Sequence, residues 1–425
     1  MTTATPPPTI GTGQEGSIRE QVTGYFLRLR QGELGALPAI GGFLVLVILF
    51  SFTSTTFFTA INFANLFTQA ATLMMLAMAL VFVILLGEID LSAGVTSGVA
   101  MCLFVVMVNV YKINWILTLA VCLVVGAAIG TFIGFFVAKV GIPSFVVTLG
   151  LFLGFQGLEL IIIGNGGLYR IETPEVLAIM NNNLPIWMGW ALLVLALLIA
   201  AGISLFDRAR RTRAGVPNRP IMLLWARLAA IGIGAAIVVA ALSTDRAAQR
   251  GTINGEPIAH KVIEGVPIVV PIAIAILWIG TFVLDRTRYG RHLYAVGGNP
   301  EAARRAGIKV AKVRIFAFVA CSTLAVVSGL FDASKIGSVS AASGVTIVLS
   351  GVAAAVVGGV SLFGGRGRLT HAAIGALVIA VIANGLGLLG LPSGANYLVT
   401  GGVLILAATF DAVSRKRAGG SLIRT

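Results

Sequence analysis

Residues 65–86 read NLFTQAATLMMLAMALVFVILL, a run that is mostly apolar and contains no charged side chain. A helix needs about 20 mostly apolar residues to cross the hydrocarbon core of a bilayer, so this run has the length of a transmembrane helix. Eleven comparable runs occupy 38–55, 92–110, 115–138, 142–163, 185–205, 221–242, 266–284, 313–331, 346–363, 370–391 and 396–412. The sequence therefore predicts about twelve transmembrane helices, some of them broken or re-entrant because they contain Gly or Pro.

The composition of the whole chain supports this prediction. Of its 425 residues 57% are hydrophobic and only 11% are charged, and the mean hydropathy is +0.99. Soluble domains carry about a quarter charged residues, so an ordinary cytosolic enzyme, a DNA-binding module and a disordered scaffold are excluded. The three cysteines lie inside apolar runs and predict neither a disulfide framework nor a metal site. The predicted fold class is an all-α polytopic membrane protein.

The basic residues predict how the helices are oriented. With the amino terminus inside, 24 of the 30 Lys and Arg residues fall on inner loops or inner helix ends, and six fall outside. Cytoplasmic loops are enriched in Lys and Arg, so both termini are predicted to be cytoplasmic. The net charge of +14 is then explained by basic inner loops that lie beside the lipid headgroups, and no nucleic-acid partner is expected. The domains are a partly disordered tail at 1–37, a transmembrane domain at 38–412 and a basic tail at 413–425.

The inner loop 285–312 contains signals for one short helix. Gly297-Gly298 marks a turn, Asn299 is a good N-cap, and Pro300 suits the first helical position. Gly307 reads as the residue at which the helix stops. We expect a helix of about two turns that lies parallel to the membrane on the cytoplasmic side. From the residues alone, it is either a solvated loop that serves topology or an element that docks a partner.

Two Gly-rich breaks interrupt apolar runs. The first, GEIDLSAG at 87–94, is either a tight hairpin with solvated acids or a discontinuous helix in which Asp90 caps exposed backbone N–H groups near a gate. The second, GGVSLFGGRGR at 358–368, has the same G-x-x-x-L-x-x-G spacing. Both follow a helix that runs from outside to inside, so they are related by a parallel repeat.

A few polar residues lie inside the predicted spans. Glu159, one turn after Gln156, faces a cavity or a partner if it lies at membrane depth, or lies near the outer headgroups. Asn384 is expected to form a hydrogen bond between packed helices. A small-residue ridge is expected to allow close helix contact, and it consists of Gly126, Gly130 and Gly134.

Three motifs resemble a known family. EAARRAGI at 301–308 resembles the E-A-A-x-x-x-G coupling loop of ABC importer permeases, and YGRHLYAVGGN at 289–299 looks like the version in monosaccharide permeases of the ribose, xylose and galactose class. The break at 87–94 resembles the G-x-I-D-L-S-x-G signature of these permeases. In that family the coupling helix docks on an ATP-binding subunit. The resemblance assigns coupling to Gly298, Asn299, Glu301, Ala302, Ala303 and Gly307, and a pathway or gate role to Asp90, Ser92, Glu159 and Asn384.

The chain departs from the family pattern in three places. Glu88 stands where members more often carry Gly or His. Residues 348–354, VLSGVAA, replace the family's E-L-x-A-I-A-A. The chain adds an inserted pair of helices at 185–242, around the basic loop 206–220, to the family's ten-helix core, an arrangement more like the xylose-type permease.

The resemblance implies the permease subunit of an importer in the plasma membrane of a prokaryote, carrying a monosaccharide, a pentose such as xylose. It implies a homodimer, ATP-binding subunits, and an extracytoplasmic sugar-binding protein that docks near 245–265. The chain has no G-x-x-x-x-G-K-[ST] motif, so no cofactor is expected in this chain, and the partner subunit binds ATP. The alternative is an ion-coupled secondary transporter that uses Glu159.

Overall fold

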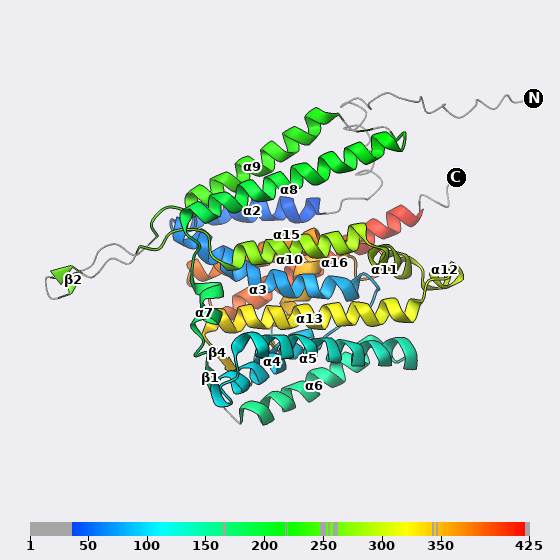
Figure 1. The fold of residues 1–425 in the computed structure, drawn as a ribbon, viewed down its shortest axis with the longest axis horizontal. Coiled ribbons are helices and arrows are strands. Elements are labelled where there is room, and N and C mark those ends of the chain that lie inside the picture. The colour runs from blue at the N-terminus through cyan, green and yellow to red at the C-terminus, as the bar shows by residue number, and fades with distance from the viewer. Residues whose placement is uncertain are drawn as a thin grey trace, which may run out of the picture.

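The computed structural model describes residues 36–164, 167–216, 218, 220–246, 252–253, 256–257, 262–341, 344–345 and 347–420. The predicted disordered part of the amino tail, and the last five residues of the basic tail, lie outside this part of the chain. The described residues are mostly helical (Figure 1). The fold is that of an all-α, multi-pass membrane protein.

Ten described helices are long and apolar enough to cross a membrane. Two of them, α4 (Ala93–Val105) and α5 (Trp115–Phe135), end in π-helical turns that extend them to Val110 and Val140. The other eight are α3 (Ala60–Ile84), α6 (Ser144–Ile163), α8 (Ile186–Arg213), α9 (Ile221–Leu242), α10 (Val269–Arg286), α13 (Val310–Ile336), α15 (Leu369–Leu388) and α16 (Ser393–Gly420). Ten of the twelve predicted apolar runs therefore form long helices.

The other two predicted spans form shorter helices. Helix α2 (Leu37–Thr53) has 17 residues, and α14 (Ile347–Val357) has 11. The prediction of a full span at 346–363 is therefore wrong in extent, although a broken helix was expected. The helix stops because Gly359 adopts a φ of +100°, which favours glycine, and because the backbone at Gly358 packs tightly on α15.

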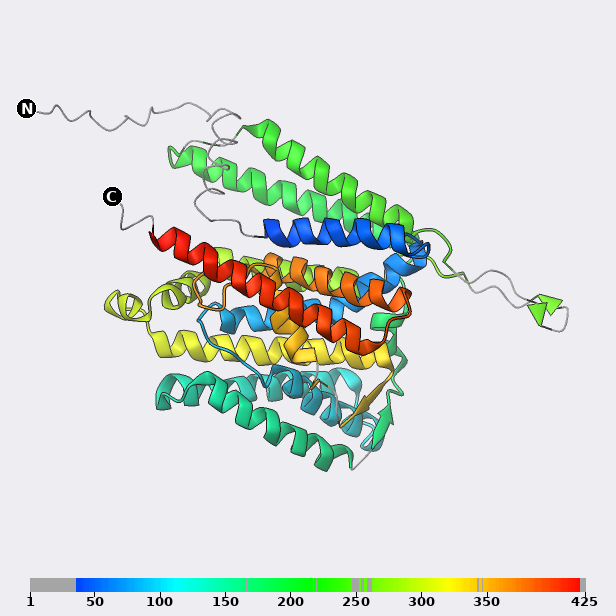
Figure 2. The same ribbon diagram turned by 180° about the vertical axis from the view of Figure 1, so that it is seen from behind.

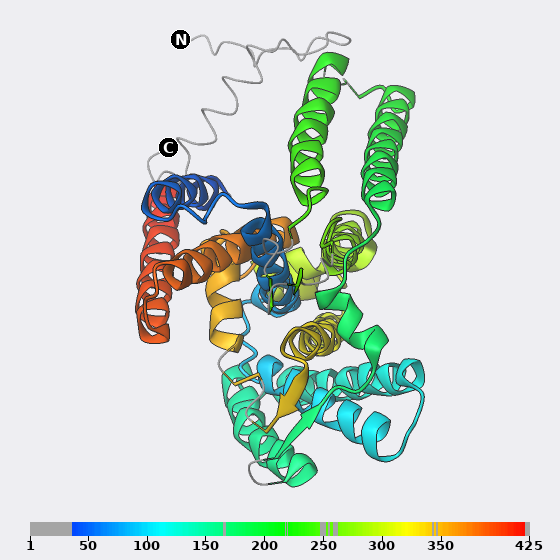
Figure 3. The ribbon, with the colours of Figure 1, turned by 90° about the vertical axis from the view of Figure 1, so that its left-hand side faces the viewer.

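The helices pack around α3, the most buried of the long helices (Figure 3). Helices α13, α14 and α15 pack directly against it. Helices α8 and α9, the predicted inserted pair, stand at the edge of the bundle and pack mainly on each other (Figures 1 and 3). The chain thus forms one helical core with a peripheral hairpin.

The contact between α5 and α13 confirms the predicted small-residue ridge. A Cβ atom added at Gly130 would lie 2.4 Å from the Phe318 carbonyl oxygen, and one at Gly134 would lie 2.7 Å from the Ile315 Cα atom. The two helices therefore touch backbone to backbone, as small residues allow.

The connecting segments gather at two opposite ends of the bundle. At one end, here called the inner end, lie α11 (Arg288–Gly298), α12 (Pro300–Arg305) and the carboxyl end of α16 (Figures 1 and 2). At the other, the outer end, lie α7 (Pro174–Asn181) and two antiparallel strand pairs (Figure 1). These pairs are β1 (Leu168–Arg170) with β4 (Ser338–Ser340), in which Leu168 is opposite Ser340, and β2 (Thr252–Ile253) with β3 (Glu256–Pro257). The side of the bilayer that each end faces stays a prediction.

Candidate coupling site

The short helix α12 forms as the sequence predicts. The Asn299 side chain accepts a hydrogen bond from the Ala302 N–H at 3.0 Å, and Pro300 occupies the first helical position. Gly307 follows the helix with a φ of +81°. Ala303 is buried, whereas Glu301 and Ala302 are exposed. One face of α12 therefore packs on the protein, and the other is open to a partner.

The structure corrects the prediction of a turn at Gly297-Gly298. These residues end a second helix, α11, which sequence reasoning treated as loop. Thr287 caps α11 by accepting a hydrogen bond from the Gly290 N–H at 3.3 Å. Leu293 and Val296 are buried on one face, at a spacing of three residues that was visible in the sequence.

Helix α11 packs directly against both Gly-rich breaks. A Cβ atom at Gly297 would lie 1.8 Å from the carbonyl oxygen of Leu85, which ends α3 two residues before the first break, and 2.9 Å from the nitrogen of Gly365, in the second break. The Gly365 N–H in turn donates a hydrogen bond to the Leu85 oxygen at 2.8 Å. Three segments that are far apart in the sequence therefore meet backbone to backbone at one point.

We call this point the glycine junction, formed by Leu85, Gly87, Gly297, Gly364 and Gly365. Three of its glycines have φ values between +70° and +81°, in the left-handed region that favours glycine. A Cβ atom at Gly364 would lie 2.8 Å from the Gly87 nitrogen and 2.9 Å from the Gly297 oxygen. A side chain at Gly297 or Gly364 would push the three segments apart, so these two glycines allow the contact.

A tyrosine bonds α11 to the second break. The Tyr294 hydroxyl donates a hydrogen bond to the Gly367 carbonyl oxygen at 2.8 Å. Burial raises the pKa of Tyr294 to about 12, so the hydroxyl keeps the proton that it donates. Helix α11 is thus held to the break at 358–368 by a side chain as well as by backbone packing.

An ion pair bonds α13 to the first break. Arg314, in the first turns of α13, lies 3.4 Å from the Glu88 carboxylate, and the two side chains are 28% and 16% exposed. Because α13 begins three residues after Gly307, Arg314 follows α12 closely along the chain. Sequence reasoning identified Glu88 as a departure from the family pattern but could not name its partner, which is more than 200 residues away.

Asp90 and Ser92 lie in the extended segment between α3 and α4. The Asp90 carboxylate accepts hydrogen bonds from the Ser92 N–H at 2.9 Å and from the Ser92 hydroxyl at 2.6 Å. Both residues are fully buried, so Asp90 is not a solvated hairpin acid. The Ile89 N–H donates to the Ser144 hydroxyl at 3.2 Å, which fixes this segment against α6. The role of Asp90 and Ser92 in a gate stays a prediction.

Glu159 and Asn384 lie away from the glycine junction. Glu159 is fully buried on α6, four residues from the outer end of that helix, and neither carboxylate oxygen has a hydrogen-bond partner among the described residues. Asn384 exchanges two hydrogen bonds of 2.9 Å with Asn62, so it joins α15 to α3. That is the expected packing role, and a pathway role for either residue stays a prediction.

The arrangement suits the transmission of movement rather than bond chemistry. Among the described residues, no group of three or more His, Cys, Asp or Glu side chains could hold a metal ion. Instead, α12 is joined to α11 through the single residue Asn299, and α11 contacts both breaks. Helix α12 is therefore connected through α11 to two interrupted membrane helices.

Comparison with known proteins places these features in a family. The family described as "Branched-chain amino acid transport system / permease component" matches residues 62–177 and 175–408. The chain is 32% identical over 411 residues to the xylose transport system permease protein XylH of Escherichia coli K12, covering 95% of this chain and 98% of the relative. No solved structure matches the chain.

Two further relatives carry similar names. The XylH protein of Haemophilus influenzae is 30% identical over 365 residues, covering 86% of this chain and 92% of the relative. The ribose import permease protein RbsC of Escherichia coli K12 is 28% identical over 387 residues, covering 91% and 96%. These relatives are permease components rather than enzymes, and ATP hydrolysis in such transport systems is done by a separate subunit. The chain therefore belongs to the family of branched-chain amino acid transport system permease components, as a non-enzymatic membrane permease.

Proposed function

We propose that the chain is the membrane subunit of an ATP-driven ABC importer that carries a monosaccharide, a pentose such as xylose, across the plasma membrane of a prokaryote. The similarity to xylose and ribose permeases over most of the chain supports the substrate class. The excess of basic residues on one set of loops supports cytoplasmic termini and about twelve membrane-embedded helices, a ten-helix core and the inserted pair at 185–242.

The observation that carries this proposal is the glycine junction. The exposed face of α12 includes Glu301 and Ala302, and this face docks on the ATP-binding subunit. When ATP binding closes the partner, α12 moves, and α11 transmits the movement to both breaks through Gly297 and Tyr294. Such coupling needs a rigid element whose two positions a ligand can bias.

Three partners complete the importer. A second copy of the chain forms a homodimer with the pathway between the copies, near Asp90 and Ser92. Two ATP-binding subunits occupy the inner end. A sugar-binding protein docks at the outer end, where β2 and β3 pair far from the helices (Figure 1). The base of that hairpin is fixed by Arg246, which is buried and donates a hydrogen bond to the Gly265 carbonyl oxygen at 2.9 Å.

The experiment is co-purification and reconstitution with an ATP-binding subunit and a sugar-binding protein encoded beside this gene. We expect Glu301→Ala and Gly307→Pro to lower sugar-stimulated ATP hydrolysis. Lys112→Gln is the control, because Lys112 lies at the outer end in an exposed ion pair with Glu172 and should have no effect. Unchanged hydrolysis in both α12 variants would contradict the coupling role. Sugar uptake driven by a pH gradient, in vesicles that contain this chain alone, would indicate the ion-coupled alternative, which no relative supports.

The homodimer has a separate test. Leu349 is exposed in the first turn of α14, and the three natural cysteines are buried. A Leu349→Cys variant should therefore be modified selectively in native membranes by a bifunctional thiol reagent. We expect a cross-linked species of twice the mass, and a product of single-chain mass at every reagent length would contradict the pathway between copies.

A further inference from the structure

A groove lies between α10 and α13 in the inner half of the bundle. It encloses a cavity of about 450 Å³, within the range of about 300–1,000 Å³ that is typical of small-molecule sites. Met78 and Phe82 of α3 line it, together with Val283 of α10 and Phe316 of α13. We call it the α10–α13 groove.

The chemistry of the groove suits hydrocarbon. Its lining side chains are apolar except for the hydroxyl group of Tyr289. A sugar placed there would lose hydrogen bonds to water with one hydroxyl group to replace them, which is costly for each unpaired group. The groove is therefore not a site for the transported sugar.

The groove opens toward the outside of the bundle. Ile279 and Phe316, on its two walls, are 57% and 59% exposed. Figure 1 shows α3 between α10 and α13, and Figure 3 shows these two helices on the opposite side of α3 from α14 and α16. In a multi-pass membrane protein, the medium next to such an opening is the acyl region of the bilayer. The side of the protein that carries α14 and the second break is left for a second copy.

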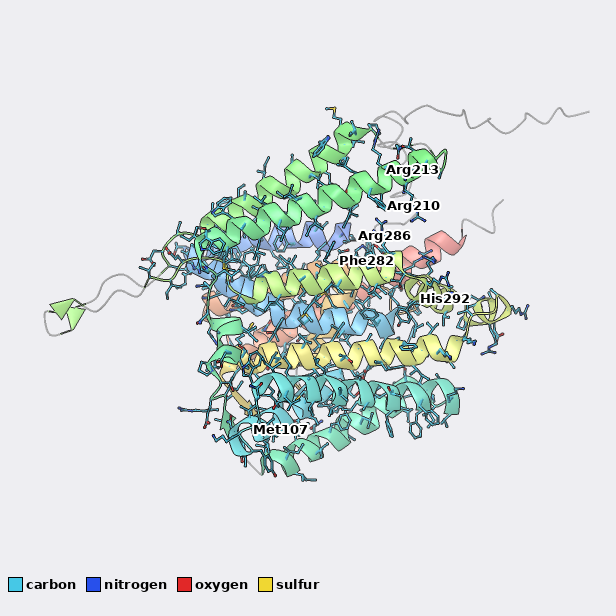
Figure 4. All side chains as sticks on the ribbon, viewed as in Figure 1. Met107, Arg210, Arg213, Phe282, Arg286 and His292 are labelled. Atoms are coloured by element: carbon cyan, nitrogen blue, oxygen red, sulfur yellow. The ribbon has the colours of Figure 1, made fainter. Side chains whose placement is uncertain are left out.

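The inner end of the groove is basic. On α13, Lys312 lies one turn before Phe316 and on the same face, and it is exposed. Arg288 is exposed and precedes Tyr289, at the start of α11. Arg286, at the end of α10 (Figure 4), forms a bidentate ion pair with Asp207 of α8, and the carboxylate offsets its charge. Lys312 and Arg288 therefore supply the positive charge at this end.

Tyr289 forms the inner end of the groove. Its side chain lines the groove, while its hydroxyl oxygen is enclosed by the protein. The Tyr289 ring packs edge-on against Phe316, with 6.3 Å between ring centroids. The two rings therefore give this end of the groove a fixed apolar wall.

We propose that the α10–α13 groove binds one acyl chain of an anionic phospholipid from the inner-end leaflet, whose phosphate is held by Lys312 and Arg288. Basic pockets between transmembrane helices on the cytoplasmic side bind anionic lipid headgroups in this way. The bound lipid separates α10 from α13, the two helices that flank α11 and α12. Lipid binding depends only on the membrane fold, whereas an effect of the lipid on coupling rests on the proposed function.

The full chain is first placed in nanodiscs of equal parts phosphatidylcholine and phosphatidylglycerol and then purified from them. Native mass spectrometry measures which lipid the protein retains. We expect one phosphatidylglycerol per chain to be retained in preference to phosphatidylcholine. Ala320 lines the groove, so Ala320→Phe fills it and should abolish retention. Ala229→Phe is the matched control, because Ala229 is exposed on α9, away from the groove, and the variant should retain the lipid.

The headgroup contacts have a test that does not alter packing. Lys312→Gln and Arg288→Gln should each lower the preference for phosphatidylglycerol about fivefold, the factor that corresponds to about 1 kcal/mol for one Lys or Arg near an anionic surface. Arg213→Gln, a cation at the same end on α8, should leave the preference unchanged (Figure 4). Equal retention in Ala320→Phe and wild type, or equal loss in both Phe variants, would overturn the proposal. Assembly with the ATP-binding subunit, measured in parallel, reports on the proposed function separately.

Discussion

Replacing Gly297 by alanine tests the glycine junction directly. The added methyl group would lie 1.8 Å from the Leu85 carbonyl oxygen, whereas real Cβ contacts are essentially never shorter than 3.0 Å. The atom that it meets is backbone, so α11 and the first break must separate by roughly 1 Å or more, as an overpacked contact requires. The 2.8 Å hydrogen bond from Gly365 to Leu85 would be lost or stretched by that movement.

The size of the effect follows from these two losses. Overpacking of this kind costs about 1–3 kcal/mol, and one net hydrogen bond contributes about 1 kcal/mol. The contact between α11 and the breaks should therefore be weakened by about 2–4 kcal/mol. A change of about 2 kcal/mol alters an equilibrium by roughly 30-fold, which is enough to uncouple the position of α11 from that of the breaks.

The assay compares sugar transported per ATP hydrolysed, with ATPase assembly as a second measurement. Gly297→Ala should lower the ratio at least tenfold and still bind the ATP-binding subunit, because α12 is unchanged. Gly298→Ala is the matched control, since a Cβ atom there would meet nothing within 4 Å. If the two variants gave the same transport ratio, the close approach of α11 would not be part of coupling.

Three further contacts give predictions. Glu88→Gln and Arg314→Gln should each lower the free energy of unfolding of the purified protein by about 1–2 kcal/mol, a value between those for exposed and buried ion pairs. The double variant Glu88→Arg with Arg314→Glu, measured by thermal unfolding, should recover part of that loss. No recovery would mean that the pair does not interact. Asn62→Ala leaves the side-chain amide of Asn384 buried without its partner and should lower the free energy of unfolding by about 1–3 kcal/mol. Replacing both Asn62 and Asn384 by Leu should cost less. Equal losses in the two variants would contradict the hydrogen bonds between the two amides. Tyr294→Phe removes only the hydrogen bond to the second break, so it should lower the free energy of unfolding by about 1 kcal/mol. It should also lower the amount of sugar transported per ATP hydrolysed, with little change in binding of the ATP-binding subunit. An unchanged amount of sugar per ATP would mean that coupling depends on the backbone contact alone.

The spans were predictable because the signal is local. A run of about 20 apolar residues has few alternatives to a membrane helix, and α9 begins and ends at the predicted residues 221 and 242. The run at 346–363 is equally apolar, yet α14 stops at Val357. The reason is tertiary: a Cβ atom at Gly358 would lie 1.9 Å from the His371 carbonyl oxygen, so this backbone is set by its neighbour on α15. Hydropathy carries no information about that contact.

The coupling site was only partly predictable for the same reason. Asn299, Pro300 and Gly307 identified α12, since caps and stops act within a few residues. The family resemblance assigned Gly298 to the site, but Gly297 is the residue that touches Leu85, just before the first break, and Gly365 in the second break. Leu85 and Gly297 are more than 200 residues apart, and no periodicity links them. Paired glycines at 297–298 and 364–365 were the visible signal of close backbone approach, although they could not show which segments approach each other.

The two kinds of contact around α11 and α13 should behave differently during transport. The glycine junction joins main chains directly, so it has no rotatable side chain to absorb a displacement, and α11 and the two breaks must move together or separate. The Glu88–Arg314 pair joins long, flexible side chains at 3.4 Å, and it can persist over a range of backbone positions. The backbone contact therefore fixes where the breaks lie relative to α11, whereas the ion pair keeps the first break beside α13 while they move. We therefore expect a movement that begins at α12 to displace both breaks, because the first contact that α11 makes with them is between main chains.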